Sequence, residues 1–191
     1  MKLYLGYSTG LIRFVAAAGL AAAFLLLIRP LVAEAQQDQE MEISLGSDLS
    51  VPGGDAFLSL TLLGKGAPVG KVTSEISFPP EVLSFVEAKR GESGDQAGAE
   101  IKTAVREAPG NPKTSVLQVV ISGGKELPEG ILATLKFKVS AAAPETDIKL
   151  LNVVKAVSLN GEEIPGVRGN EAILTISPAK LPSVGCFLFT H

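Results

Sequence analysis

Short runs in which apolar and polar side chains alternate recur through the chain from residue 41 to residue 177. In the longest run, residues 131–139, Lys136 and Lys138 fall on one side, and the other side carries Ile131, Ala133, Leu135, Phe137 and Val139. Alternation with a period of two is typical of a β-strand that buries one face. Residues 41–45 and 57–62 show the same pattern, so we expect strands in all three segments.

Further candidate strands fill the space between these segments, at residues 71–78, 82–89, 99–106, 115–122, 147–158 and 171–177. Pairs such as Pro109-Gly110 and Asn160-Gly161 mark the turns between them. Residues 81–89 would also suit a short helix; no other segment after residue 40 favours one. About nine short strands at this spacing predict an all-β protein, an antiparallel β-sandwich over residues 41–177.

The chain begins with the features of a secretory signal. A basic start is followed by an unbroken apolar stretch, residues 14–28, and then by the small residues Ala33 and Ala35 around Glu34. We expect a signal helix in residues 1–35 that is cleaved near Ala35, a polar leader at 36–40, and a secreted, cell-surface or periplasmic bacterial protein. The alternative is an uncleaved anchor, and this segment is the only predicted contact with a membrane.

The mature chain lacks the residues that most catalytic and metal sites require. The only histidine is His191 and the only cysteine is Cys186, both in a linker-like tail at residues 178–191. Triads based on histidine, zinc sites and an internal disulfide are therefore excluded. We expect no catalytic residue, no metal site and no cofactor; calcium held by Glu92 and Asp95 is the one weak alternative, because calcium requires more oxygen ligands than these two supply.

The charge and the aromatic content of the chain limit the classes of partner that it can bind. Once residues 1–35 are removed, 14 basic and 19 acidic residues remain, and a net charge of about −5 without a basic stripe argues against nucleic acid. The chain has no tryptophan, and both tyrosines lie in the signal. We expect Phe57, Phe78, Phe85 and Phe137 to belong to the core. A strip of exposed rings that stacks on polysaccharide is therefore disfavoured, whereas binding of a soluble sugar through polar groups remains open.

Four segments in order resemble the cohesin domain, from about Leu49 to Ile176. They are VPGGDAFLSLTLLG (51–64), VGKVTSEISFPPEVLSF (69–85), LPEGILATLKFKVSAAAP (127–144) and NEAILTIS (170–177). The run GILATLKFKV, which is similar to the strand that follows the acidic loop of cohesins, is the most specific of them. The resemblance implies a nine-stranded jelly-roll sandwich and an extracellular recognition role. Bacterial scaffoldins use such domains to hold enzymes that carry dockerins.

The chain also departs from the cohesin pattern. Phe78-Pro79-Pro80 stands where cohesins usually carry Tyr-Asp-Pro, so the acidic residue is missing. Lys71 and Thr73 fall near the position where many dockerin-binding cohesins show a polar Asn/Asp pair. The resemblance therefore implies the fold and a recognition role, with dockerin as one possible partner.

The favoured hypothesis is a non-catalytic adhesion or scaffold module that binds another extracellular protein through one sheet face. The candidate contact residues are outward positions of the strands at 71–78 and 115–122, namely Lys71, Thr73, Glu75, Gln118 and Val120. Val120 points outward if Leu117, Val119 and Ile121 point inward. The alternatives are a carbohydrate-binding module in polysaccharide catabolism and an accessory subunit of the cell envelope, such as a part of a secretion or pilus machine.

Overall fold

A computed structural model describes residues 41–64 and 68–178 of the chain. Within these ranges it contains twelve strands and one short helix, α2 (Glu92–Gln96). The strands are β1 (Glu42–Leu45), β2 (Asp48–Ser50), β3 (Asp55–Leu63), β4 (Val69–Phe78), β5 (Leu83–Arg90), β6 (Glu100–Ala108), β7 (Asn111–Ser122), β8 (Gly130–Val139), β9 (Thr146–Ser158), β10 (Glu163–Ile164), β11 (Arg168–Gly169) and β12 (Glu171–Ile176).

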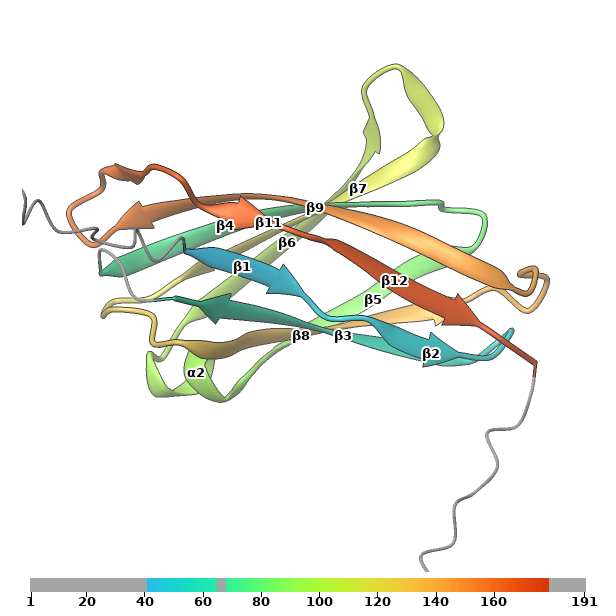
Figure 1. The fold of residues 1–191 in the computed structure, drawn as a ribbon, viewed down its shortest axis with the longest axis horizontal. Helices are drawn as coiled ribbons and strands as arrows, with labels where there is room; N and C mark the ends of the chain where they lie inside the picture. The colour runs from blue at the N-terminus through green and yellow to red at the C-terminus, as the bar shows by residue number, and fades with distance from the viewer. Residues whose placement is uncertain (1–40, 65–67, 179–191) are drawn as a thin grey trace, which may run out of the picture. The chain divides into compact units, whose positions relative to one another are not determined.

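The strands form two sheets that lie against each other as the layers of a sandwich (Figure 1). The five-stranded sheet has the order β11-β1-β3-β8-β5. The seven-stranded sheet has the order β2-β12-β9-β4-β7-β6, and β10 pairs with the free part of β9. All nine predicted strands are present, and the expected all-β sandwich is confirmed. The three that were not predicted, β2, β10 and β11, have only two or three residues each.

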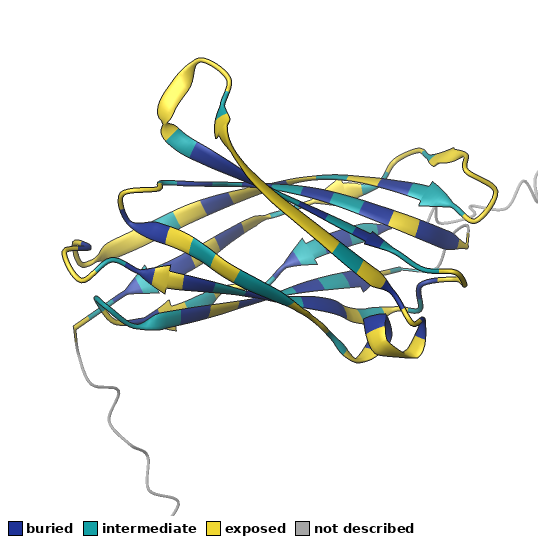
Figure 2. Ribbon diagram, turned by 180° about the vertical axis from the view of Figure 1, so that it is seen from behind, coloured by how far each residue is buried: buried dark blue, intermediate teal, exposed yellow. Residues whose placement is uncertain are grey.

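Alternation along the strands builds the core, as the bands of buried and exposed residues in Figure 2 show. Ile43 and Leu45 of β1, Leu58 and Leu60 of β3, and Leu135 of β8 are almost fully buried. The ring of Phe137 lies at the centre of an aromatic cluster, with edge-to-face contacts to Phe78 at 5.4 Å and to Phe85 at 5.7 Å between ring centroids. Edge-to-face geometry is the arrangement that the ring quadrupoles prefer.

Two pairings are parallel, which differs from the purely antiparallel sandwich expected. β1 pairs with β11 in the five-stranded sheet, and β2 pairs with β12 in the seven-stranded sheet. The paired residues are separated by the same number of positions in both pairings: Glu42 faces Arg168, and Ser50 faces Ile176. The first described segment therefore runs beside the last one across both sheets, at a constant separation of 126 residues.

Two side chains lie on the face opposite to the one predicted. Phe57 was expected in the core, but 53% of its surface is exposed. It shares the outward side of β3 with Ser59 and Thr61, so period two should have placed it outside. Ile131 was expected to point inward and is exposed, because a bulge in the β3–β8 pairing lets Leu132 and Ala133 both face the core.

The segments on either side of Gly91 show which of them forms a strand and which forms a helix. Most of the ambiguous segment 81–89 lies in strand β5, which runs from Leu83 to Arg90. The one described helix, α2, begins just after Gly91, in a segment that the sequence did not favour as a helix. A Cβ at Gly91 would lie 2.3 Å from the Ile131 carbonyl oxygen, and one at Gly94 would lie 2.3 Å from the Leu132 carbonyl oxygen. These two glycines therefore let α2 pack directly on the backbone of β8.

The predicted signal at 1–35, the polar leader at 36–40 and nearly all of the tail at 178–191, with Cys186 and His191, lie outside the described residues. Cleavage near Ala35 and export therefore stay predictions. In the described part of the chain, no helix is long and apolar enough to span a bilayer.

Candidate partner-binding face

The five predicted contact residues come together on the outer side of the seven-stranded sheet. Lys71, Thr73 and Glu75 alternate along β4 with buried Val72, Ser74 and Ile76. Gln118 and Val120 alternate along β7 with the buried side chains of Leu117, Val119 and Ile121. The outward direction assigned to Val120 is therefore confirmed. Their role in binding stays a prediction.

The register between β4 and β7 places these residues opposite one another. Thr73 faces Val120, and Glu75 faces Gln118. One oxygen of the Glu75 carboxylate accepts a hydrogen bond from Gln118 Nε2 at 3.2 Å and an ion-paired one from Arg106 Nη2 at 3.0 Å. Arg106 reaches this carboxylate from β6. Three neighbouring strands thus contribute one polar network, which holds the middle of the face in a single arrangement.

An apolar patch adjoins this network and was not found from the sequence. On β9, Leu151 faces Ser77 and Val153 faces Glu75, and each is 52% exposed. Ile173 of β12 lies diagonally beside Leu151, because its Cα partner on β9 is Lys149. We call Leu151, Val153 and Ile173 the apolar patch. Lys149 and Lys155 lie on the same side of β9 as Leu151 and Val153. The two lysines are therefore the sequence signal that this side faces outward.

A buried polar clasp fixes β9 behind the patch. Asn152 points inward, where its side-chain amide donates to the Ile43 carbonyl of the opposite sheet at 2.7 Å. The buried hydroxyl of Ser74 donates to Asn152 Oδ1 at 2.6 Å. Buried amides and hydroxyls require such partners because an unpaired one is costly. The clasp holds Asn152 pointing inward, so its neighbours Leu151 and Val153 lie on the outside.

The side chain of Asn170 extends the connection between the sheets. Its Oδ1 accepts from the Leu45 backbone amide at 2.6 Å, and its Nδ2 donates to the Leu45 carbonyl at 2.8 Å. The Asn170 amide thus supplies the donor and acceptor that a strand would offer at this point. The backbone amide of Asn152 donates to the Asn170 carbonyl, which joins the two asparagines.

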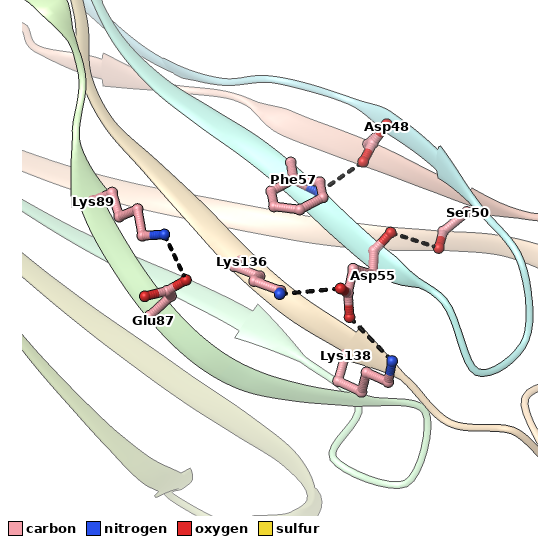
Figure 3. Close-up of polar contacts among 8 residues, drawn as sticks. All are labelled: Asp48, Ser50, Asp55, Phe57, Glu87, Lys89, Lys136 and Lys138. Carbon is pink, nitrogen blue, oxygen red and sulfur yellow. Dashed lines mark hydrogen bonds and ion pairs between the residues drawn. The ribbon is translucent and has the colours of Figure 1, made fainter.

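The outer side of the five-stranded sheet is organised by charge. Asp55 of β3 lies between two lysines of β8, 3.0 Å from Lys136 Nζ and 3.1 Å from Lys138 Nζ (Figure 3). The hydrogen bonds from these two ammonium groups lower the pKa of the Asp55 carboxyl below its ordinary value. Lys136 also lies over the exposed ring of Phe57, 5.7 Å from its centroid.

The weak calcium alternative places its two carboxylates on α2. The Asp95 carboxylate forms an ion pair with Arg90 Nε at 3.0 Å, and Glu92 accepts from Gln96 Nε2 at 3.5 Å. No cluster of three or more histidine, cysteine or acidic side chains occurs among residues 41–64 and 68–178. The arrangement therefore gives calcium no further protein carboxylate beside this pair.

No protein-family model matches the chain, and no curated protein matches its sequence. Solved structures do match its fold. A non-cellulosomal cohesin from the hyperthermophilic archaeon Archaeoglobus fulgidus is 17% identical, with a TM-score of 0.58 over 72% of this chain and 91% of that one. The cohesin CaCohA2 from Clostridium acetobutylicum is 16% identical, with a TM-score of 0.58 over 74% and 93%.

Complexes are also among the matches. A type I cohesin–dockerin complex from Clostridium thermocellum, Coh-OlpA–Doc918, gives 14% identity and a TM-score of 0.58 over 72% of this chain and 99% of the matched one. The described domain therefore has a cohesin-like fold, as the sequence segments implied.

Proposed function

We propose that this chain is a non-catalytic module, exported from a bacterial cell, that binds a partner protein through the outer face of the seven-stranded sheet. The observation that carries the proposal is the apolar patch of Leu151, Val153 and Ile173 beside the ordered polar network of Glu75. An exposed apolar cluster with a polar rim is the usual form of a protein-binding surface. The patch lies on the β9 and β12 strands, next to the predicted contact residues of β4 and β7.

A dockerin-type domain is the partner that we favour. The support is the similarity in fold to cohesins that were solved together with dockerins. The contact surface differs in sequence from the cohesin pattern at Lys71, Thr73 and Phe78-Pro79-Pro80, so we expect a partner with its own specificity. A cohesin described as non-cellulosomal shares the fold, which is consistent with a role outside a cellulosome.

Carbohydrate binding has less support. Phe57 is the only exposed aromatic ring in the described part of the chain, and it lies beneath Lys136 rather than in a strip of rings. A polysaccharide bound by stacking would need the flat, amphipathic rings of tryptophan or tyrosine, and none is present after residue 7. A role as an envelope accessory subunit would use the same protein-binding face.

A pair of matched substitutions tests the proposed face. Leu151→Arg introduces a charge into the apolar patch, with Glu171 and Ser77 opposite it to tolerate the arginine. Leu63→Arg makes the same change on the five-stranded sheet, where Leu63 is 44% exposed and faces Glu42. Binding is measured by calorimetry against a panel of dockerin domains and by pull-down from the source secretome, at several calcium concentrations.

We expect Leu151→Arg to weaken partner binding at least about tenfold and Leu63→Arg to leave it unchanged, because truncation or charging of a central contact removes most of its binding energy. Circular dichroism checks that both variants fold. Equal binding by Leu151→Arg and the wild type would move the interface elsewhere. Failure to recover any partner at any calcium concentration would argue against a binding module altogether.

A further inference from the structure

Among the described residues, strand β6 is the one long, regular edge of the sandwich. The two sheet orders end at β11 and β5 in one and at β2 and β6 in the other, and the two-residue β10 pairs only with β9. β11 and β2 have two and three residues, and β5 contains a bulge between Phe85 and Glu87. Short strands and bulges are devices that prevent edge-to-edge pairing. β6 has nine residues and pairs with β7 without interruption from Glu100 to Glu107.

The free edge of β6 carries accessible backbone and exposed side chains. No described strand pairs with its other side. The hairpin of β6 and β7 projects beyond the sandwich in Figure 1, and its exposed outer strand is visible in Figure 2. Val105 lies opposite the buried Leu117 of β7 and is nevertheless 51% exposed. An exposed strand of this kind is a template for another strand.

The sequence of β6 is complementary to itself when reversed. In an antiparallel pair formed about a two-fold axis, the axis passes through a residue, because hydrogen-bonded and non-hydrogen-bonded positions alternate along the edge. An axis through Thr103 places Glu100 opposite Arg106 of the second copy and Ile101 opposite Val105, each combination occurring twice. Opposite charges and β-branched pairs directly across from each other stabilise a sheet.

The two adjacent axes lack this complementarity. An axis through Lys102 places the two copies of that lysine opposite each other. An axis through Ala104 places Lys102 opposite Arg106 of the second copy, twice. Like charges directly opposite are destabilising. Among these three axes, the charges on β6 therefore favour the one through Thr103.

The surroundings of β6 leave room for a second strand. A groove of about 700 Å³ lies beside its first residues, lined by β5 residues Lys89 and Arg90, by Asp95 of α2, and by Glu100 and Ile101. In the register centred on Thr103, Glu107 of the second copy falls opposite Ala99, which also lines this groove. Val105 of the second copy falls opposite Ile101, which is half-buried at the same groove.

We propose that the chain forms a homodimer by antiparallel pairing of β6 with β6 of a second copy, with the two-fold axis at Thr103. The pairing joins the two seven-stranded sheets into one continuous sheet. Because the axis of an antiparallel pair is perpendicular to the sheet, both apolar patches face the same side. The dimer presents two partner-binding faces next to each other, although its formation does not depend on what those faces bind.

Cysteine cross-linking tests the register directly. In the full chain carrying Cys186→Ser, Thr103→Cys places two sulfur-bearing side chains across the axis, with Cβ atoms roughly 4.5–5.5 Å apart, near the span of a disulfide. Val105→Cys lies on the same face of the same strand, but its two copies are four residues apart, roughly 13 Å. Under mild oxidation we expect a disulfide-linked dimer of Thr103→Cys and a monomer of Val105→Cys. Equal cross-linking of both variants, or none of either, would overturn the proposal.

A charge exchange tests the same pairing without a covalent bond. Arg106→Glu places a carboxylate opposite Glu100 of the second copy at both ends, and we expect the dimer dissociation constant to rise about tenfold. The double variant Glu100→Arg with Arg106→Glu restores opposite charges and is expected to restore dimerisation. The single and the double variant both lose the ion pair between Arg106 and Glu75. This loss therefore cannot cause a difference between the two variants.

Sedimentation equilibrium between about 10 µM and about 1 mM, with a reductant present, measures the association. A wild-type chain that stays monomeric over this range would refute the dimer. The same conclusion would follow if the single and double variants associated equally well.

Discussion

The two sheets of the sandwich differ in how they distribute polar side chains. The buried strand residues of the five-stranded sheet are all apolar, and on its outer face Asp55 lies between Lys136 and Lys138. The seven-stranded sheet buries the polar pair of Ser74 and Asn152 and exposes the apolar patch. Every buried polar strand residue described belongs to the seven-stranded sheet or its edge strand β2.

This difference between the sheets shows which side-chain pattern the fold requires and which departures from that pattern it tolerates. A strand with one buried face needs only alternation, and the five-stranded sheet buries only apolar strand residues, although its outer side also exposes Phe57 and Leu63. Departures from it are unfavourable for an isolated domain: a buried amide needs a partner, and an exposed apolar cluster favours association. The seven-stranded sheet contains both departures on adjacent residues of β9, where Asn152 lies between Leu151 and Val153. The clasp therefore helps to hold the two neighbouring side chains of the patch on the outside of the sheet.

The largest effect is expected from the inner face of the five-stranded sheet. Phe137→Ala should lower the free energy of unfolding by about 3–5 kcal/mol, because it removes a fully buried ring that contacts Phe78 and Phe85. Phe57→Ala, on the outer face of the same sheet, should cost less than about 1 kcal/mol, the contribution of an exposed cation–π contact. Urea denaturation measures both. Equal losses would show that the two faces of this sheet are not distinguished by burial.

A smaller effect is expected from the interior of the seven-stranded sheet. Asn152→Ala should cost about 1–3 kcal/mol, because it leaves the Ile43 carbonyl and the Ser74 hydroxyl without their buried partner. Thr73→Ala changes the opposite face of the same sheet and should stay within about 0.5 kcal/mol. The comparison uses urea midpoints with unchanged slopes. An Asn152→Ala variant as stable as the wild type would show that the clasp does not stabilise the fold.

The smallest effects are expected from the surface ion pairs, and they have opposite pH dependence on the two sheets. The lowered pKa of Asp55 makes its stabilising contribution complete above its ordinary value of 3.8 and lost as the pH falls through the folded value. The hydrogen bond from Lys149 to Glu171 raises the pKa of Lys149, so that contribution is complete below 10.5 and lost as the pH rises further.

Asp55→Asn should therefore flatten the acid limb of the melting temperature against pH, and Glu171→Gln should flatten the alkaline limb. Carboxyl and ammonium NMR titrations check the two directions. A carboxyl pKa of Asp55 at or above 3.8 would contradict the predicted ion pairing with Lys136 and Lys138.

The positions of the long strands could be predicted from the sequence because burial of one face imposes a pattern on side chains. Residues 131–139 show both the success and its limit. Lys136 and Lys138 correctly marked the outer face, but the bulge at Leu132 reversed Ile131, and a bulge leaves no local mark in an apolar run. Helix α2 was missed because five residues give no periodicity and its position depends on the contact of Gly91 and Gly94 with β8.

The candidate face could be predicted in part. Alternation placed Lys71, Thr73 and Glu75 on one side of β4 and so beside Gln118 and Val120. Which strands lie next to them is a matter of long-range pairing, so the position of β9 beside β4 was not accessible. In the run from residue 147 to 158, Lys149 and Lys155 lie on the same side as Leu151 and Val153, which marks that side as the outer one. The position of Leu151 and Val153 beside Ile173 and the Glu75 network required the structure.

The continuous parallel register between residues 42–50 and 168–176 constrains the order in which the domain can assemble. β2 has β12 as its only described partner, so it cannot be placed until the last strand has been synthesised. A ribosome delivers the N-terminal strands first; β1 can pair early with β3, but β2 waits for a partner 126 residues later. Contacts of such high sequence separation close slowly. The nascent polypeptide therefore remains incompletely folded until its final strands emerge, which gives any machinery that handles unfolded chains the whole time of synthesis in which to act.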